Sequence, residues 1–103
     1  MPGLRLWLDD LRPPPPGWTW VTTAWDAITG LASGDVVEVS LDHDLGPPEA
    51  GTGDDVARWI EAEAHHGRLP RLRWAVHSAN PIGAARMTVA LERAERAWAA
   101  AGR

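Results

Sequence analysis

The sequence contains no cysteine and no lysine, and neither phenylalanine nor tyrosine occurs in it. Without cysteine the chain forms no disulfide and no thiolate metal site, so oxygen or imidazole groups must hold any metal it binds. Without lysine all ten basic residues are arginine, and no ammonium group is available to an active site. The aromatic residues are seven tryptophans in a chain of 103 residues.

Long apolar runs are also missing. No stretch approaches the roughly 18 apolar residues of a membrane span, and residues 1–20 lack the basic start and apolar run of a signal peptide. We therefore expect a cytoplasmic protein with no membrane partner. A net charge of −4 argues against general nucleic-acid binding, which depends on cationic side chains. An apolar content of 45% over residues 1–103 predicts a single globular domain.

Short apolar runs predict the strands of this domain. They lie at residues 4–9, 18–22, 36–42 and 72–78. Residues 10–17, between the first two runs, are too few and too rich in proline for a crossover helix. The last run alternates apolar and polar residues, which is typical of an edge strand with one covered face.

Three helical patterns complete the predicted fold. The first follows an N-cap at Thr23, the second begins at a capping box of Thr52 and Asp55, and the third begins at Pro81. Strands that alternate with helices pair in parallel through right-handed crossovers. The residues after Ser78 form only one helical pattern, so no fifth strand is expected. The prediction is an α/β domain with a mostly parallel four-stranded sheet and three helices.

Acidic residues stand at the ends of two predicted strands. Asp9 and Asp10 end the first strand, Asp42 ends the third, and Asp44 follows it. In open parallel sheets ligands bind beyond the carboxyl ends of the strands. Clustered carboxylates repel one another unless a cation lies between them, and Mg²⁺ prefers such oxygen ligands. Asp9, Asp10, Asp42 and Asp44 are therefore predicted metal ligands for Mg²⁺, or for Mn²⁺, which suits the same ligand type.

Aspartate is also a common turn and N-cap residue, so each of these positions alone is ambiguous. The expected meeting of several acids at one edge of the sheet favours the metal site over a set of structural turns. Ordinary turns would not need to bring their carboxylates together.

Polar residues near the same edge are candidates to bind a phosphate. Ser78 and Asn80 carry donors just before the last helix, whose free N–H groups attract anions. Arg12, in the loop after the acidic pair, and Arg86, about one turn into the last helix, are cationic candidates. The alternatives are a helix-entry turn for Ser78 and Asn80 and surface ion pairs for the arginines.

Two histidines are candidates for proton transfer. His43 and His77 stand beside the acids, where an imidazole protonates a leaving oxygen or activates water. The alternative is that each only hydrogen-bonds a neighbouring aspartate. Trp18 and Trp20, beside the proline loop, are either core residues or surfaces on which a nucleobase stacks.

The motifs resemble a known family. Leu8-Asp9-Asp10, the segment 41–46 and Ser78-Ala79 are similar to the landmarks of response-regulator receiver domains. More specifically, LWLDDLRPPPPGW, SLDHDLG and VHSANPIGAARM resemble the cyclic-phosphate-processing receiver-like domain family, over residues 4–91. The resemblance implies a flavodoxin/receiver-like fold, Asp9 and Asp10 as metal ligands, and Asp42 as the counterpart of the phosphoacceptor. It also places Ser78 where the receiver hydroxyl contacts the phosphoryl group.

The chain departs from receivers in lacking their lysine and their fifth strand. Phosphorylation by a histidine kinase is therefore not expected, whereas phosphoester chemistry is. The function predicted is Mg²⁺-dependent binding and hydrolysis of a small nucleotide-like or cyclic phosphate, in which Asp42 attacks or orients water and His77 or His43 moves a proton. The alternatives are a non-enzymatic signalling module that binds a protein of unknown identity through its last helix, and a fold that serves only as a scaffold.

Overall fold

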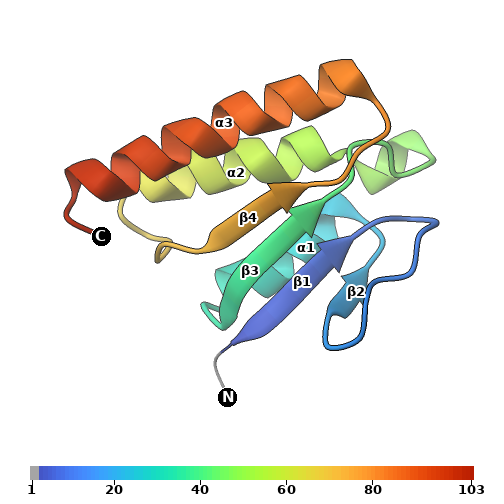
Figure 1. Cartoon of the computed structure of the whole chain (residues 1–103), viewed down its shortest axis with the longest axis horizontal. Helices are drawn as coiled ribbons and strands as arrows, with labels where there is room; N and C mark the ends of the chain where they lie inside the picture. Colours follow the sequence, from blue (N-terminus) through green and yellow to red (C-terminus); the bar gives the residue numbers. More distant parts are fainter. Residues whose placement is uncertain (1–2) are drawn as a thin grey trace.

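The computed structural model describes residues 3–103; each predicted strand is present within two residues of its expected ends, and each predicted helix begins at its expected start (Figure 1). The strands are β1 (Leu4–Leu8), β2 (Thr19–Val21), β3 (Val36–Leu41) and β4 (Arg73–Val76). The helices are α1 (Ala24–Ala32), α2 (Gly53–His65) and α3 (Pro81–Ala100), with a short 3-10 helix η1 (Pro48–Ala50) before α2. None of the helices in this part of the chain is long and apolar enough to cross a membrane.

The sheet has the strand order β2-β1-β3-β4, and every neighbouring pair is parallel. The edge position predicted for the last strand is confirmed. The connection from β1 to β2 contains no helix, as expected from its prolines, yet the two strands still pair in parallel. Trp7 holds this connection against the sheet, because its indole N–H donates to the carbonyl of Arg12 at 2.8 Å.

The helices cover one face of the sheet. The crossovers from β2 to β3 and from β3 to β4 advance in the same direction across the sheet, and right-handed connections then place α1 and α2 on the same face. Figure 1 shows α1 behind the strands and α3 beside α2 and β4. The core between these layers is formed by fully buried side chains from every helix and the central strands, among them Leu8, Leu31, Leu41, Ile60, Leu91 and Trp98.

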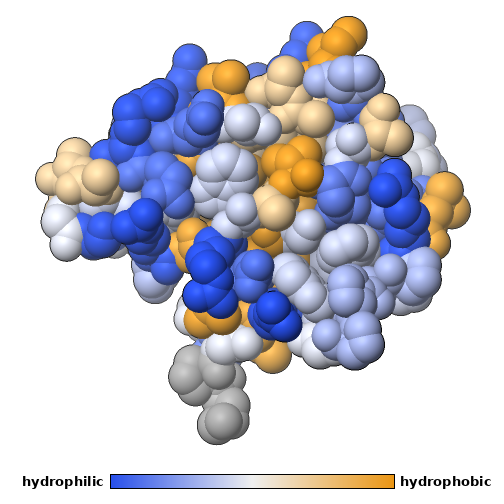
Figure 2. All heavy atoms as spheres, in the orientation of Figure 1, coloured by the Kyte–Doolittle hydropathy of each residue, from blue (hydrophilic) through white to orange (hydrophobic). Residues whose placement is uncertain are grey.

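The opposite face of the sheet has no helix over it within residues 3–103. Trp7, Trp20 and Ser40 lie in register on this face. In the first half of the strands, Glu38 of β3 accepts hydrogen bonds from Arg5 of β1 at 3.3 Å and from Arg73 of β4 at 3.4 Å. These bonds join three strands. Figure 2 shows the surface on this side as a mixture of polar and apolar patches.

The start of α2 is set by the predicted capping box. The Thr52 hydroxyl accepts from the N–H of Asp55, and the Asp55 carboxylate accepts from the N–H of Thr52 at 2.9 Å. Gly53 follows, and its N–H donates to the carbonyl of His43 at 2.9 Å. A side chain at this position would run into the carbonyl of Asp42, so the close approach of α2 to the end of β3 requires glycine.

Candidate metal and phosphate site

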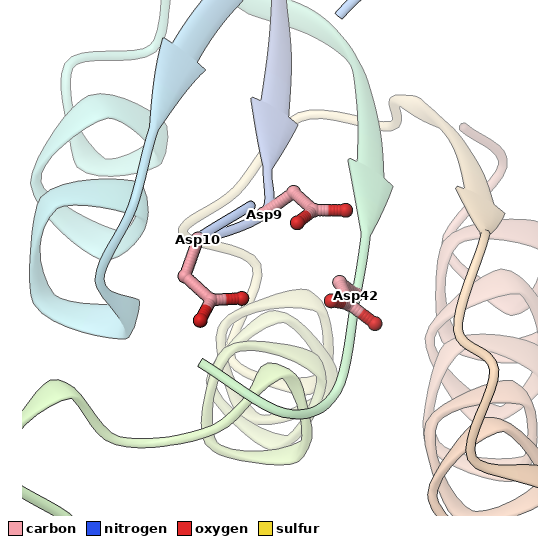
Figure 3. Close-up of side chains that lie close together, drawn as sticks. All are labelled: Asp9, Asp10 and Asp42. Carbon is pink, nitrogen blue, oxygen red and sulfur yellow. The ribbon is translucent and has the colours of Figure 1, made fainter. Parts of the chain in front are cut away.

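Three of the predicted acids meet beyond the carboxyl ends of β1 and β3. Asp9, Asp10 and Asp42 each offer a carboxylate oxygen, and these oxygens all lie within 4.8 Å of one another (Figure 3). The pairing of β1 with β3 causes this approach, because Leu8 pairs with Leu41 and the N–H of Asp42 donates to the Leu8 carbonyl at 3.0 Å. The residues that follow the two strands are thereby placed side by side.

Asp9 is the most constrained of the three acids, with an exposed fraction of only 1%. Its Oδ1 accepts from the N–H groups of Leu11 and Arg12, both at 2.8 Å. Its Oδ2 accepts from His77 Nε2 at 3.1 Å and lies 3.9 Å from Arg12 Nε. Burial raises the pKa of Asp9, but hydrogen bonds from Arg12, Leu11 and His77 outweigh it and hold this pKa below its ordinary value. Asp9 is thus an ionised carboxylate in a fixed orientation.

Asp10 and Asp42 have fewer protein partners. Asp42 is buried, and its Oδ1 accepts from the N–H of His43 at 2.9 Å. The Asp10 carboxylate accepts no hydrogen bond from the described residues, and Gly46, at φ 89°, leaves it room, because a side chain there would lie 3.3 Å from Asp10 Oδ2. Free carboxylate oxygens beside a third, ionised carboxylate make a donor set that fits a hard divalent cation. The residues present therefore fit the expected metal, although they do not select Mg²⁺ over Mn²⁺.

Both ring nitrogens of His77 are engaged. Nδ1 lies 2.7 Å from the hydroxyl of Ser40, and Nε2 lies 3.1 Å from the Asp9 carboxylate. Because a carboxylate only accepts, we assign the proton to Nε2, and the Ser40 hydroxyl then donates to Nδ1. Burial lowers the pKa of His77, while the charges of Asp9 and Asp42 oppose this shift. The neutral imidazole therefore holds the Asp9 carboxylate in place.

His43 has one free nitrogen. Its Nδ1 lies 2.9 Å from Asp44 Oδ1, and its ring packs against Gly83 in the first turn of α3. Nε2 has no partner among residues 3–103, and since these residues contain no buried unpaired side-chain polar atom, Nε2 is accessible to solvent. The hydrogen bond from His43 lowers the pKa of Asp44, against a smaller opposing effect of burial and with help from Asn80. His43 and Asp44 form an imidazole–carboxylate pair beside the three acids.

Asp44 is not among the acids that the structure brings together. Its side chain is 70% exposed and turns toward His43 and Asn80, whose Nδ2 lies 3.4 Å from Asp44 Oδ2. Its predicted ligand role would require its carboxylate to leave these partners.

The predicted phosphate-binding residues occupy three regions. Arg12 lies beside Asp9, at the acids. The Ser78 hydroxyl accepts from the N–H of Asn80 at 3.1 Å, and Asn80 caps α3 by accepting from Gly83 at 3.1 Å. Arg86 instead lines a groove of about 570 Å³ between α2 and α3, together with Asp54 and Arg58.

Sequence reasoning missed Ser40 and Trp7 as parts of the site. Ser40 supplies a hydrogen bond to His77, and Trp7 stacks on the same ring. The available signal was the two-residue period of a strand: Ser40 precedes Asp42, and Trp7 precedes Asp9, by two positions. Each pair therefore lies on one face of the sheet.

An all-parallel sheet with acids at the ends of β1 and β3 is the arrangement expected of a receiver-like domain. A family model described as the cyclic-phosphate processing receiver domain matches residues 4–93, and the chain belongs to this family. Neither the curated proteins nor the solved structures contain a match to the chain. The family that the motifs predicted is thus confirmed, and so is the receiver-like fold.

Proposed function

We propose that this domain binds Mg²⁺ or Mn²⁺ through Asp9, Asp10 and Asp42 and hydrolyses a phosphoester bond in a small nucleotide-like or cyclic phosphate. The observation that carries the proposal is the approach of three carboxylates to within 4.8 Å of one another. Such a cluster is stabilised when a bound divalent cation offsets the repulsion between its negative charges. A phosphate oxygen commonly completes the coordination of Mg²⁺. Membership of the cyclic-phosphate processing family supports the choice of substrate class.

The cation, when bound, supplies positive charge that stabilises the phosphoryl oxygens as charge develops on them. Asp42 then has either of two roles. In one, its carboxylate attacks phosphorus, the ester P–O bond breaks, and water later hydrolyses the aspartyl phosphate; in the other, Asp42 orients the attacking water directly. Asp42 Oδ2 suits both roles, because only Oδ1 carries a protein hydrogen bond. Arg12 and Ser78 are placed in this proposal as contacts to the phosphate oxygens.

His43 is the better of the two candidates for moving the proton. His77 already uses both ring nitrogens, on Ser40 and Asp9. His43 uses only Nδ1, and its Nε2 is free to give a proton to the leaving oxygen or to take one from water. The Asp44 carboxylate would stabilise the imidazolium form that either step involves.

The test is a phosphoesterase screen of the purified domain against linear and cyclic nucleotides and simple phosphate esters, with Mg²⁺, Mn²⁺ or a chelator. We expect metal-dependent turnover that is lost in Asp42→Asn. Labelled phosphate trapped on Asp42 would distinguish direct attack from activation of water. Absence of turnover on every ester, combined with labelling of Asp42 by acetyl phosphate, would contradict the hydrolase and favour a non-enzymatic module.

A further inference from the structure

Two exposed apolar side chains adjoin the acids of the candidate site. Among residues 3–103 the large apolar side chains that are exposed are Leu4, Leu11, Trp20, Trp25, Ile82 and Val89. Leu11 follows the acidic pair, and Trp20 reaches Asp9 from β2, whereas the other four side chains have no contact with the acids. Binding sites for organic ligands commonly combine apolar surface with a few well-placed polar groups. Leu11 and Trp20 therefore favour a ligand that carries an apolar part as well as a phosphate.

Among these exposed side chains, Trp20 is the one that forms a hydrogen bond with an acidic residue of the candidate site. Its side chain is 45% exposed, and its indole N–H donates to the backbone carbonyl of Asp9 at 2.7 Å. The hydrogen bond restrains the ring beside the residue whose carboxylate forms part of the metal site. A flat aromatic surface and the candidate cation site thus adjoin the same aspartate.

Trp18 does not offer such a surface. Its ring meets Trp7 edge to face at a centroid distance of 5.9 Å, and the guanidinium of Arg5 lies 4.9 Å from its ring centroid. Through both contacts Trp18 packs against the face of the sheet opposite the helices. Of the two tryptophans that the sequence marked for stacking, only Trp20 is left available.

We propose that Trp20 is a stacking platform for the base of a nucleotide whose phosphate is held at Asp9, Asp10 and Asp42. This inference rests on the proposed function, since it takes the phosphate position from it. It narrows the substrate from small nucleotide-like or cyclic phosphates to nucleotides, because a base has a flat π surface and a sugar phosphate has none. The indole bonds to the backbone carbonyl of Asp9, and the cation would bind the carboxylate of the same residue. The two subsites are therefore adjacent, and the ribose would lie between them.

The test compares binding of inorganic phosphate, ribose phosphate, AMP and cyclic AMP to the full chain by calorimetry, with saturating Mg²⁺. The variants are Trp20→Leu, which removes the flat surface, and Trp20→Phe, which keeps a flat ring but loses the N–H bond to Asp9. Trp25→Leu is the matched control. Trp25 is also exposed and also donates its indole N–H to a backbone carbonyl, but this carbonyl belongs to Glu49, at 2.8 Å, and not to Asp9.

We expect Trp20→Leu to weaken AMP or cyclic AMP binding about tenfold or more, the usual effect of one base–aromatic stack. Trp20→Phe should retain most of that affinity. The affinity for inorganic phosphate should be the same in all variants, and so should the affinity for ribose phosphate. Trp25→Leu should bind all four compounds like the parent protein.

The inference is overturned if AMP and cyclic AMP bind no more tightly than ribose phosphate, or if both Trp20 variants lose phosphate and nucleotide affinity together. The second result would show that the indole only positions Asp9. If none of the four compounds binds in the presence of Mg²⁺, the proposed function itself fails, and the inference fails with it.

Discussion

The imidazole of His77 lies flat on the indole of Trp7, with ring centroids 3.9 Å apart and ring planes inclined by 11°. This stack holds the imidazole between Ser40 and Asp9, so that both of its nitrogens bond to groups on neighbouring strands. Outer partners of this kind orient the carboxylates that hold metal ions. The position of Asp9 therefore depends on side chains from β1, β3 and the end of β4.

His77→Phe tests this dependence. Phenylalanine preserves the stack on Trp7 but leaves the buried Ser40 hydroxyl and one oxygen of Asp9 without their imidazole partner. We expect a loss of about 1–3 kcal/mol in the free energy of unfolding and a fall of about 10–100-fold in cation affinity. Urea unfolding and Mn²⁺ titration measure the two effects.

Ser40→Ala is the control for His77→Phe. It removes one hydrogen bond from the imidazole and leaves the bond to Asp9, so cation affinity should fall less than in His77→Phe. Equal cation affinity in both variants would contradict a positioning role for His77.

Asp10→Asn should raise the melting temperature of the domain in a chelator and abolish the further increase that Mg²⁺ produces. Asp10 lies within 4.8 Å of two other carboxylates and accepts no hydrogen bond from the described residues, so neutralising it relieves repulsion without loss of a contact. Thermal melts with and without Mg²⁺ measure both effects. A lower melting temperature in the chelator would show that repulsion among the acids is not significant.

Asp9→Asn should behave differently, although it also removes one charge from the cluster. Its Oδ1 accepts from Leu11 and Arg12, which an amide oxygen can replace, but its Oδ2 accepts from His77, and the amide NH₂ group in that position cannot accept. We expect destabilisation of about 1–3 kcal/mol in the chelator. Stabilisation comparable to that of Asp10→Asn would show that the hydrogen bonds contribute less than the repulsion.

Gly53→Ala should destabilise the domain by about 1–3 kcal/mol, as overpacking does, and weaken cation binding. The new methyl group would collide with the carbonyl of Asp42 and lie 2.7 Å from the sulfur of Met87. Gly30→Ala is the matched control: its methyl group would lie 3.6 Å from Leu6, an ordinary contact. In the helix interior that substitution should stabilise by about 0.5–1 kcal/mol. Chemical unfolding of both variants tests the pair.

The stability of the cation-free domain should fall as the pH is lowered below about 6.5, the ordinary pKa of histidine. Because burial lowers the pKa of His77 in the folded state, the unfolded chain binds this proton first, and stability rises with pH through this interval. Unfolding in urea with a chelator, between pH 5 and pH 8, measures the slope. The slope should be smaller in His77→Phe, and an identical slope in that variant would contradict the assignment.

A further fall at more acidic pH is expected from Asp9. Its pKa is below the ordinary value of 3.8 in the folded state, so its stabilising contribution is complete above that value and is lost as the pH falls through the folded pKa.

Much of this protein follows from local sequence. Apolar runs and capping residues such as Thr23 and Thr52 determine where strands and helices begin, because these signals act between residues a few positions apart. The placement of Asp9 and Asp42 at strand ends is likewise visible in the sequence, and with the motifs around them it predicted the family that the comparison confirms. The alternation of the last strand predicted its edge position for the same reason.

Only the tertiary structure decided what each side chain at the site faces. The register of β1 on β3 brings Asp9 to Asp42, and packing of the loop after β3 against α3 turns Asp44 toward His43 and Asn80. His77 is oriented toward Asp9 by a hydrogen bond with Ser40, which lies 37 positions before His77 along the chain. Side-chain direction at a strand end depends on contacts between segments that are distant in sequence, and no local pattern records them.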